Sequence, residues 1–158
     1  MDYQRLYRAR FSERDKKEKA IIWEVLCNEF LNKFIRSTDW VLDIGAGYCE
    51  FINNIKCGTK YAIDLNEDIR EYADRDVQVI IGDCKEMQDI PDKKFDVAFM
   101  SNFLEHMNSK DEIEAMLINI KSKLRDNGIL VILQPNIKYF IEITGIILII
   151  ISLYLILV

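Results

Sequence analysis

Five short apolar runs, rich in β-branched residues, are spaced along most of the chain. They cover Trp40 to Ile44, Lys60 to Asp64, Val77 to Ile81, Phe95 to Met100 and Ile129 to Gln134. Continuous apolar runs of this length are typical of strands whose two faces are both covered in a parallel sheet. Each run is therefore predicted to be a buried β-strand.

The segments before and between these strands have helical patterns. From about Asp15 to Arg36, apolar residues recur at steps of three and four, which predicts an amphipathic helix. Further helices are predicted over Cys49 to Ile55, Glu67 to Ala73 and Lys110 to Lys123, and Asn127-Gly128 marks the end of the last. Alternating strands and helices imply right-handed crossovers between parallel strands. The predicted fold class is α/β, a doubly wound, Rossmann-like, mainly parallel sheet of about five strands.

Composition and charge exclude several classes of protein. The formal net charge of -5 argues against a nucleic-acid binder, which would need a basic face to displace counterions. The basic residues near the N-terminus are interpreted as a solvated helix face. Four cysteines without C-x-x-C spacing, and no apolar leader, indicate reduced thiols in the cytoplasm. With His106 as the only histidine, no metal site is predicted.

The strongest local motif joins the first strand to a glycine turn that opens a helix. It contains Asp43, Gly45, Ala46 and Gly47, and glycine at such a turn lets a ligand approach the backbone closely. Taken alone, a G-x-G turn is weak evidence, because a tight strand-to-helix connection can need glycine for its geometry only.

Two more carboxylates strengthen the prediction of a ligand site. Asp64 ends the second strand, where it can accept hydrogen bonds from both hydroxyls of a ribose. Asp83 follows the third strand, where it can accept from an adenine amino group, and Asp43 can serve a cationic amino-acid group. Glu50 stands where a dinucleotide fingerprint has its third glycine and would repel a pyrophosphate. A sulfonium ligand without phosphate fits this set better.

The chain resembles class I S-adenosylmethionine-dependent methyltransferases over about Phe11 to Tyr139. The motifs that carry the resemblance are Val41 to Phe51, Tyr61 to Asn66, Ile81 to Cys84, Phe95 to His106 and Leu124 to Leu130. More narrowly, GAGYCEFIN, SNFLEHM and LQPNIKYF are similar to small bacterial methyltransferases associated with glycan or lipid modification.

The resemblance implies S-adenosylmethionine as cofactor and a glycan, lipid or other small molecule as methyl acceptor. The cofactor-binding residues that it implies are Asp43, Gly45, Ala46, Gly47, Asp64, Leu65, Asp83, Cys84 and Ser101. His106 is the candidate general base, although a residue that only packs at a helix start explains it equally well. Two other functions stay open: an inactive, membrane-tethered adenosylmethionine-binding or scaffold domain, and an NAD-dependent oxidoreductase, against which Glu50 and Asp83 argue.

The C-terminal tail departs from the family pattern, which continues with a helix and two further strands. From Ile143 to Val158 no residue is charged, and the 20 residues of 139–158 would form a helix about 30 Å long, the thickness of a hydrocarbon core. We predict a methyltransferase domain over 1–138 and a hydrophobic helix over 139–158, able to anchor the domain to the cytoplasmic face of a membrane.

Two other interpretations of the tail are open. It could be a buried element that replaces the last strands, although it has no turn signal and is apolar on every face. It could also result from a truncation or a change of reading frame. Without the last strands, Ile129 to Gln134 would form a long apolar edge that is prone to aggregation unless something covers it.

Overall fold

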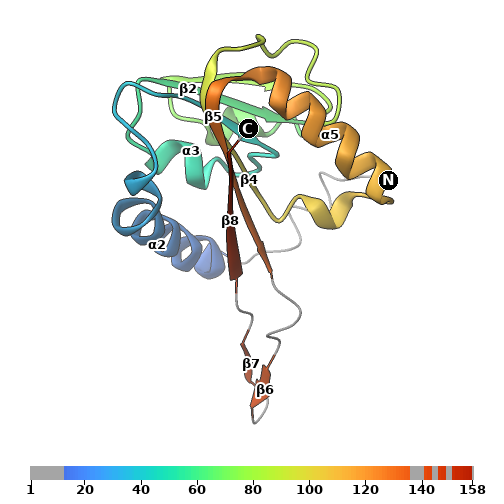
Figure 1. The fold of residues 1–158 in the computed structure, drawn as a ribbon. Coiled ribbons are helices and arrows are strands. Elements are labelled where there is room, and N and C mark those ends of the chain that lie inside the picture. Colours follow the sequence, from blue (N-terminus) through green and yellow to red (C-terminus); the bar gives the residue numbers. More distant parts are fainter. Residues whose placement is uncertain (1–12, 136–140, 144–145, 149–150, 158) are drawn as a thin grey trace.

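The fold is an open sheet flanked by helices, and the computed structural model describes residues 13–135, 141–143, 146–148 and 151–157 (Figure 1). The four predicted helices and five predicted strands are present, although the first helix ends at Glu29 and a short 3-10 turn follows. The helical elements are α2 (Glu13–Glu29), η1 (Leu31–Lys33), α3 (Glu50–Asn54), α4 (Ile69–Tyr72), η2 (Leu104–His106) and α5 (Lys110–Lys123). The strands are β1 (Trp40–Ile44), β2 (Thr59–Asp64), β3 (Val77–Ile81), β4 (Phe95–Ser101), β5 (Leu124–Pro135), β6 (Ile141–Ile143), β7 (Ile146–Leu148) and β8 (Ile151–Leu157).

The main sheet has the strand order β3-β2-β1-β4-β5-β8. Its first five strands are parallel, with β1 paired to β2 on one side and to β4 on the other. The predicted fold class, a doubly wound and Rossmann-like sheet, is confirmed. The direction of winding reverses between β1 and β4, and sheets of this class bind ligands in the crevice beyond the carboxyl ends of the strands at such a point.

Alternate residues of each strand enter two separate cores, one on each face of the sheet. On one face, Val41 and Phe99 pack with residues of α2, η1, α3 and α4. On the other face, Leu42 and Met100 pack with Met116 of α5. Each such side chain, when fully buried, contributes about 1.5 to 3 kcal/mol to stability. Because α2 and α3 pack together on the same face of the sheet, α2 lies close to the carboxyl end of β1.

The turn signal Asn127-Gly128 lies inside β5 and does not separate it from α5. The helix ends at Lys123, and Leu124 already pairs with the start of β4. Regular pairing resumes where Ile129 lies opposite Val97. From Leu124 to Ile129 the chain advances five residues along β5, whereas from Phe95 to Val97 it advances only two along β4. The surplus residues form a bulge in which Asn127 has a φ of 64°. Asn127 and Gly128 therefore do form a turn, but the turn bends strand β5 and does not end a helix.

The C-terminal tail corrects the prediction of a hydrophobic helix, because its described residues form the strands β6, β7 and β8. β8 runs antiparallel to β5, from Ile129 opposite Leu157 to Pro135 opposite Ile151. Isoleucine is β-branched and favours extended backbone, and the edge of β5 offers the hydrogen-bonding groups that an apolar strand needs. β8 thus covers the edge that the sequence predicted to be exposed.

Three sequence predictions concern residues at the limits of the described structure. Among the described residues, no helix has the length and apolar character needed to cross a membrane. The predicted boundary between residues 138 and 139 lies outside the described residues. The basic residues Arg5, Arg8 and Arg10 lie outside them as well.

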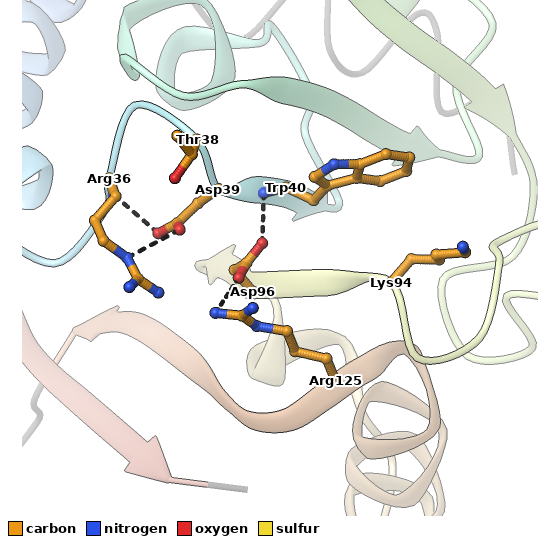
Figure 2. Close-up of a pocket in the computed structure, with 7 residues that line it drawn as sticks. All are labelled: Arg36, Thr38, Asp39, Trp40, Lys94, Asp96 and Arg125. Atoms are coloured by element: carbon orange, nitrogen blue, oxygen red, sulfur yellow. Dashed lines mark hydrogen bonds and ion pairs between the residues drawn. The ribbon is translucent and has the colours of Figure 1, made fainter.

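Two aspartate–arginine pairs lie at the amino ends of the central strands (Figure 2). Asp96 accepts a hydrogen bond from the backbone N–H of Trp40 at 2.8 Å and forms an ion pair with Arg125. Asp39 accepts from the backbone N–H of Arg36 at 2.9 Å and from its Nε at 3.1 Å. The two carboxylate side chains are only 10% and 5% exposed. Both pairs line a polar hollow of about 420 Å³, and the contacts of Asp96 connect β1, β4 and β5.

Candidate active site

The turn between β1 and α3 uses backbone conformations that glycine adopts most easily. Gly45 has a φ of 70° and Gly47 a φ of 53°. A Cβ on Gly45 would lie 2.5 Å from the ring of Phe103, whereas a Cβ on Gly47 would meet nothing within 4 Å. The N–H groups of Gly45 and Ala46 donate to the carbonyl of Ile63 in β2 at 2.9 and 3.3 Å, which fixes the turn. Gly47 therefore leaves open space on a rigid backbone.

Asp64 ends β2 against this turn. One of its carboxylate oxygens accepts the backbone N–H of Gly47 at 2.8 Å, and the other accepts that of Asn66 at 2.9 Å. Each oxygen of an ionised carboxylate has a second lone-pair site. Asp64 can therefore hold the turn and still accept hydrogen bonds from a ligand.

Asp83 and Cys84 follow the next strand, β3. Asp83 accepts the backbone N–H of Lys85 at 2.8 Å, which fixes the carboxylate by a local turn. Cys84 is buried, and its thiol donates to the carbonyl of Ile63 at 3.6 Å. Burial raises the pKa of the Cys84 thiol to about 12. At neutral pH the Cys84 thiol is therefore protonated, so that it packs against its neighbours and does not act as a nucleophile.

Asp43 lies within β1 and is only 3% exposed. Burial raises the pKa of this carboxyl well above its ordinary value, and the negative charges of Asp64 and Glu50 raise it further, against a hydrogen bond from the backbone of Ile52. No ion pair joins Asp43 to a lysine or arginine among the described residues. A cationic ligand group placed here would supply the missing counter-charge.

The segment after β4 is fastened to β5 by two hydrogen bonds. The backbone N–H of Asn102, which has a φ of 51°, donates to the carbonyl of Leu133 at 3.0 Å. The amide nitrogen of Gln134 donates to Oε2 of Glu105 at 3.2 Å. His106 ends η2 with an exposed side chain. Its position and that of Glu105 are therefore set by the neighbouring strand.

A cavity of about 900 Å³ lies over the carboxyl ends of the central strands, and it is lined by every residue that the sequence predicted for the site. These residues are Asp43, Gly45, Ala46, Gly47, Asp64, Leu65, Asp83, Cys84, Ser101 and His106. The cavity is within the size range of known small-molecule and cofactor sites. The residues are thus brought together, while their individual roles stay predictions.

The N-terminal helix supplies lining residues that the sequence did not predict. Lys19 and Trp23 lie one turn apart on α2, and both line the cavity. The ammonium of Lys19 forms an ion pair with Glu50 at 2.8 Å and lies 5.5 Å from the centre of the Tyr48 ring. The four-residue spacing could have placed Lys19 and Trp23 on one face of a helix. Nothing in the pattern indicates that this face meets the glycine turn.

Aromatic side chains form an apolar wall of the same cavity. The rings of Phe51 and Phe99 stack with their centres 3.7 Å apart, and Trp23 meets Phe99 edge-on at 6.1 Å. Phe103 lies over Gly45, and Met107 follows it on the same side. Sequence reasoning missed these residues because an apolar side chain in a strand or helix is indistinguishable from a core residue.

The order of the strands and a cavity at the carboxyl ends of the central ones are typical of Rossmann-like proteins that bind a small-molecule cofactor. A family model described as a methyltransferase domain matches residues 42–132, which is more than half of the chain. The chain therefore belongs to this methyltransferase family. A search of curated proteins returned no significant match.

Several solved structures, among them adenosylmethionine-dependent methyltransferases, are similar in fold. An adenosylmethionine-dependent methyltransferase from Archaeoglobus fulgidus is 25% identical with a TM-score of 0.61, over 75% of this chain and 54% of that one. A protein from Pyrococcus horikoshii is 20% identical with a TM-score of 0.68, over 85% and 67%. A methyltransferase from Aquifex aeolicus is 19% identical with a TM-score of 0.61, over 80% and 74%. The chain spans between 52% and 57% of the length of three matched structures.

Proposed function

We propose that the chain binds S-adenosylmethionine in the 900 Å³ cavity and transfers its methyl group to a small acceptor molecule. The observation that carries this proposal is the set of Asp43, Asp64 and Asp83, which line one cavity at three neighbouring strands and form no ion pair among the described residues. S-Adenosylmethionine, when bound, supplies an electrophilic methyl group on a positively charged sulfur.

Each carboxylate suits a different part of this cofactor. Asp64 keeps lone-pair sites for the two ribose hydroxyls, and Asp83 can accept from the adenine amino group. Asp43, buried and without a cation beside it, suits the ammonium end. Glu50 begins α3 beside the turn where a pyrophosphate would bind, and its bulk there disfavours a dinucleotide even though its charge is paired with Lys19 at 2.8 Å.

The remaining residues of the site act mainly by positioning. Displacement at a methyl carbon is accelerated when the nucleophile and the leaving sulfur are held in line, and the aromatic wall and Phe103 limit the poses that an acceptor can adopt. His106 lines the same cavity, where it can take a proton from the acceptor during the reaction.

Isothermal titration calorimetry of the whole chain with S-adenosylmethionine, S-adenosylhomocysteine and NAD tests the proposal. We expect the first two to bind and NAD to bind at least about tenfold more weakly. Asp64→Ala should weaken adenosylmethionine binding by about 10- to 100-fold, the usual effect of losing hydrogen bonds to a charged group. Asp89→Ala, which removes an exposed carboxylate outside the cavity, is the matched control.

Two outcomes would contradict the proposal: a folded chain that binds no adenosylmethionine, or one that binds NAD equally well. The role of His106 is tested separately with His106→Ala. If this variant keeps full turnover and cofactor affinity, His106 is not the base, although the proposed activity stands.

A further inference from the structure

Apart from Ser101 at the end of β4, the residues proposed to hold the cofactor lie at β1 and on one side of it. Strands β2 and β3 lie on one side of β1, with Asp64 and Asp83 at their ends, whereas β4 and β5 lie on the other side. Glu105, which follows β4 and contacts Gln134 of β5, lines this second side together with Phe103 and Met107. The β4 side is therefore the part of the cavity that is left for the methyl acceptor.

The charges of the lining residues restrict what can bind there. Among the described residues that line the cavity there is no arginine, and both lysines are already paired: Lys19 with Glu50 at 2.8 Å and Lys85 with Glu112 at 3.2 Å. A phosphate or carboxylate on the acceptor would thus face carboxylates, and the described cavity lining offers it no unpaired lysine or arginine. Because like charges repel one another, an anionic acceptor is disfavoured.

Glu105 is a carboxylate on the acceptor side that forms no ion pair among the described residues. Gln134 holds its Oε2 through the amide nitrogen at 3.2 Å, while no hydrogen bond to Oε1 is found in the described part of the chain. The carbonyl oxygen of the same Gln134 amide is buried and has no hydrogen-bond partner in the part of the chain that the structure describes. The hydrogen bond from Gln134 therefore orients the carboxylate of Glu105.

We propose that the methyl acceptor is an amine with an apolar body, and that Glu105 receives its ammonium group while Gln134 positions Glu105. This inference rests on the proposed methyltransferase function and names the substrate class for the same cavity. The apolar part of the amine fits against Phe103 and Met107, and the cation gains from the face of the aromatic ring as well as from the carboxylate.

Glu105 also has a place in the chemistry. An ammonium nitrogen must lose one proton before its lone pair can form a bond to carbon, and while Glu105 holds the nitrogen, His106 can take that proton as in the proposed function. As the new N–C bond forms, the S–C bond breaks and its electron pair stays on the sulfur. The positive charge passes from sulfur to the methylated nitrogen, so the total charge of the site is unchanged.

Three probes of the same size and different charge test the proposal: benzylamine, benzyl alcohol and benzoate. Each is titrated into the whole chain loaded with S-adenosylhomocysteine, and binding is followed by NMR chemical shifts so that no turnover is needed. We expect benzylamine to bind at least about tenfold more tightly than benzoate, with benzyl alcohol between them. Affinity for S-adenosylhomocysteine is measured first, because its loss would contradict the proposed function and not this inference.

Glu105→Gln keeps the shape of the side chain and an oxygen that can accept from Gln134, but removes the charge. The ratio of benzylamine to benzoate affinity should fall to about threefold or less, while Glu114→Gln, an exposed glutamate on α5, keeps the full ratio. Gln134→Ala should reduce the ratio by about threefold without changing affinity for S-adenosylhomocysteine. Failure of benzylamine to bind, tighter binding of benzoate, or an unchanged ratio in Glu105→Gln would overturn the proposal.

Discussion

At the amino end of the sheet each buried aspartate faces an arginine, whereas at the carboxyl end the aspartates of the cavity do not. Asp39 and Asp96 combine a backbone hydrogen bond with a guanidinium partner (Figure 2). Asp64 and Asp83 also accept backbone N–H groups, but the described residues give them no cation. The same side chain therefore connects strands at one end and leaves negative charge for a ligand at the other.

The difference shows how a structural carboxylate can be told from a binding one. A carboxylate that is already neutralised has little to gain from a cationic ligand, because its charge and its lone pairs are in use. Asp43 is the opposite case, since burial raises its pKa and no lysine or arginine of the described chain pairs with it, although a backbone hydrogen bond from Ile52 acts against the shift. A structural aspartate is therefore distinguished from a ligand-binding one by its position in the sheet and by whether a cation pairs with it. Residue type alone does not distinguish them.

The largest expected effect concerns the amino end. Asp96→Ala should lower the free energy of unfolding by about 2 to 3 kcal/mol, because the N–H of Trp40 and the guanidinium of Arg125 both lose their acceptor. Denaturant unfolding measures this change. Affinity for adenosylmethionine, compared at a temperature where the variant is folded, should stay close to that of the wild type. A stability like that of the wild type would show that this pair does not hold the strands.

Asp43→Asn should have the opposite profile. We expect affinity for adenosylmethionine to fall by at least about tenfold, because a charged hydrogen-bond partner of the cation is lost. The unliganded variant should be more stable than the wild type at neutral pH, since an amide needs no ionisation in the buried site. Thermal unfolding with and without ligand measures both effects. A destabilised unliganded variant would contradict the assigned environment.

The raised pKa of Asp43 also predicts a pH dependence. Because the folded protein holds this proton more tightly than the unfolded chain, its free energy of unfolding should fall as pH rises from the ordinary carboxyl pKa to the raised one. A cationic ligand favours the ionised form, so affinity for adenosylmethionine should rise over the range of the raised pKa and then level off. Calorimetry in parallel on Asp43→Asn isolates the contribution of Asp43, because the protonation of the ligand's own amino group changes with pH in the same way for both proteins.

The smallest effect is expected at the exposed ion pair of Lys93 and Asp126. Its two side chains are 61% and 92% exposed, and pairs of this kind contribute little in water. Asp126→Ala should leave the midpoint of thermal unfolding within the error of the measurement. A loss comparable to that of Asp96→Ala would mean that burial does not distinguish the two pairs.

Much of the sheet could be predicted because its strands are covered on both faces. Continuous apolar runs such as Trp40 to Ile44 and Val77 to Ile81 match the observed strands, and Lys110 to Lys123 matches the observed helix. Once the strands are known, Asp64 and Asp83 are expected at one edge, because parallel strands end on the same side. That these two carboxylates line the same cavity follows from this geometry.

The other parts depend on tertiary contacts that local patterns do not contain. The face of α2 that carries Lys19 and Trp23 is chosen by its packing beside α3, which no periodicity reveals. An apolar run such as Ile151–Leu157 suits a helix or a strand, and the free edge of β5 decides between them. The link between Glu105 and Gln134 joins two distant segments that carry no shared motif.

The pairing of β8 with β5 also affects how the chain reaches its fold. Pro135 pairs with Ile151, 16 residues later, whereas the central pair of Val41 and Val97 is separated by 56 residues. Closing the longer loop costs about 1 kcal/mol more in chain entropy. The outer edge of the sheet can therefore assemble as a local unit, while the joining of β1 to β4, which also creates the crevice for the ligand, is entropically the more demanding step.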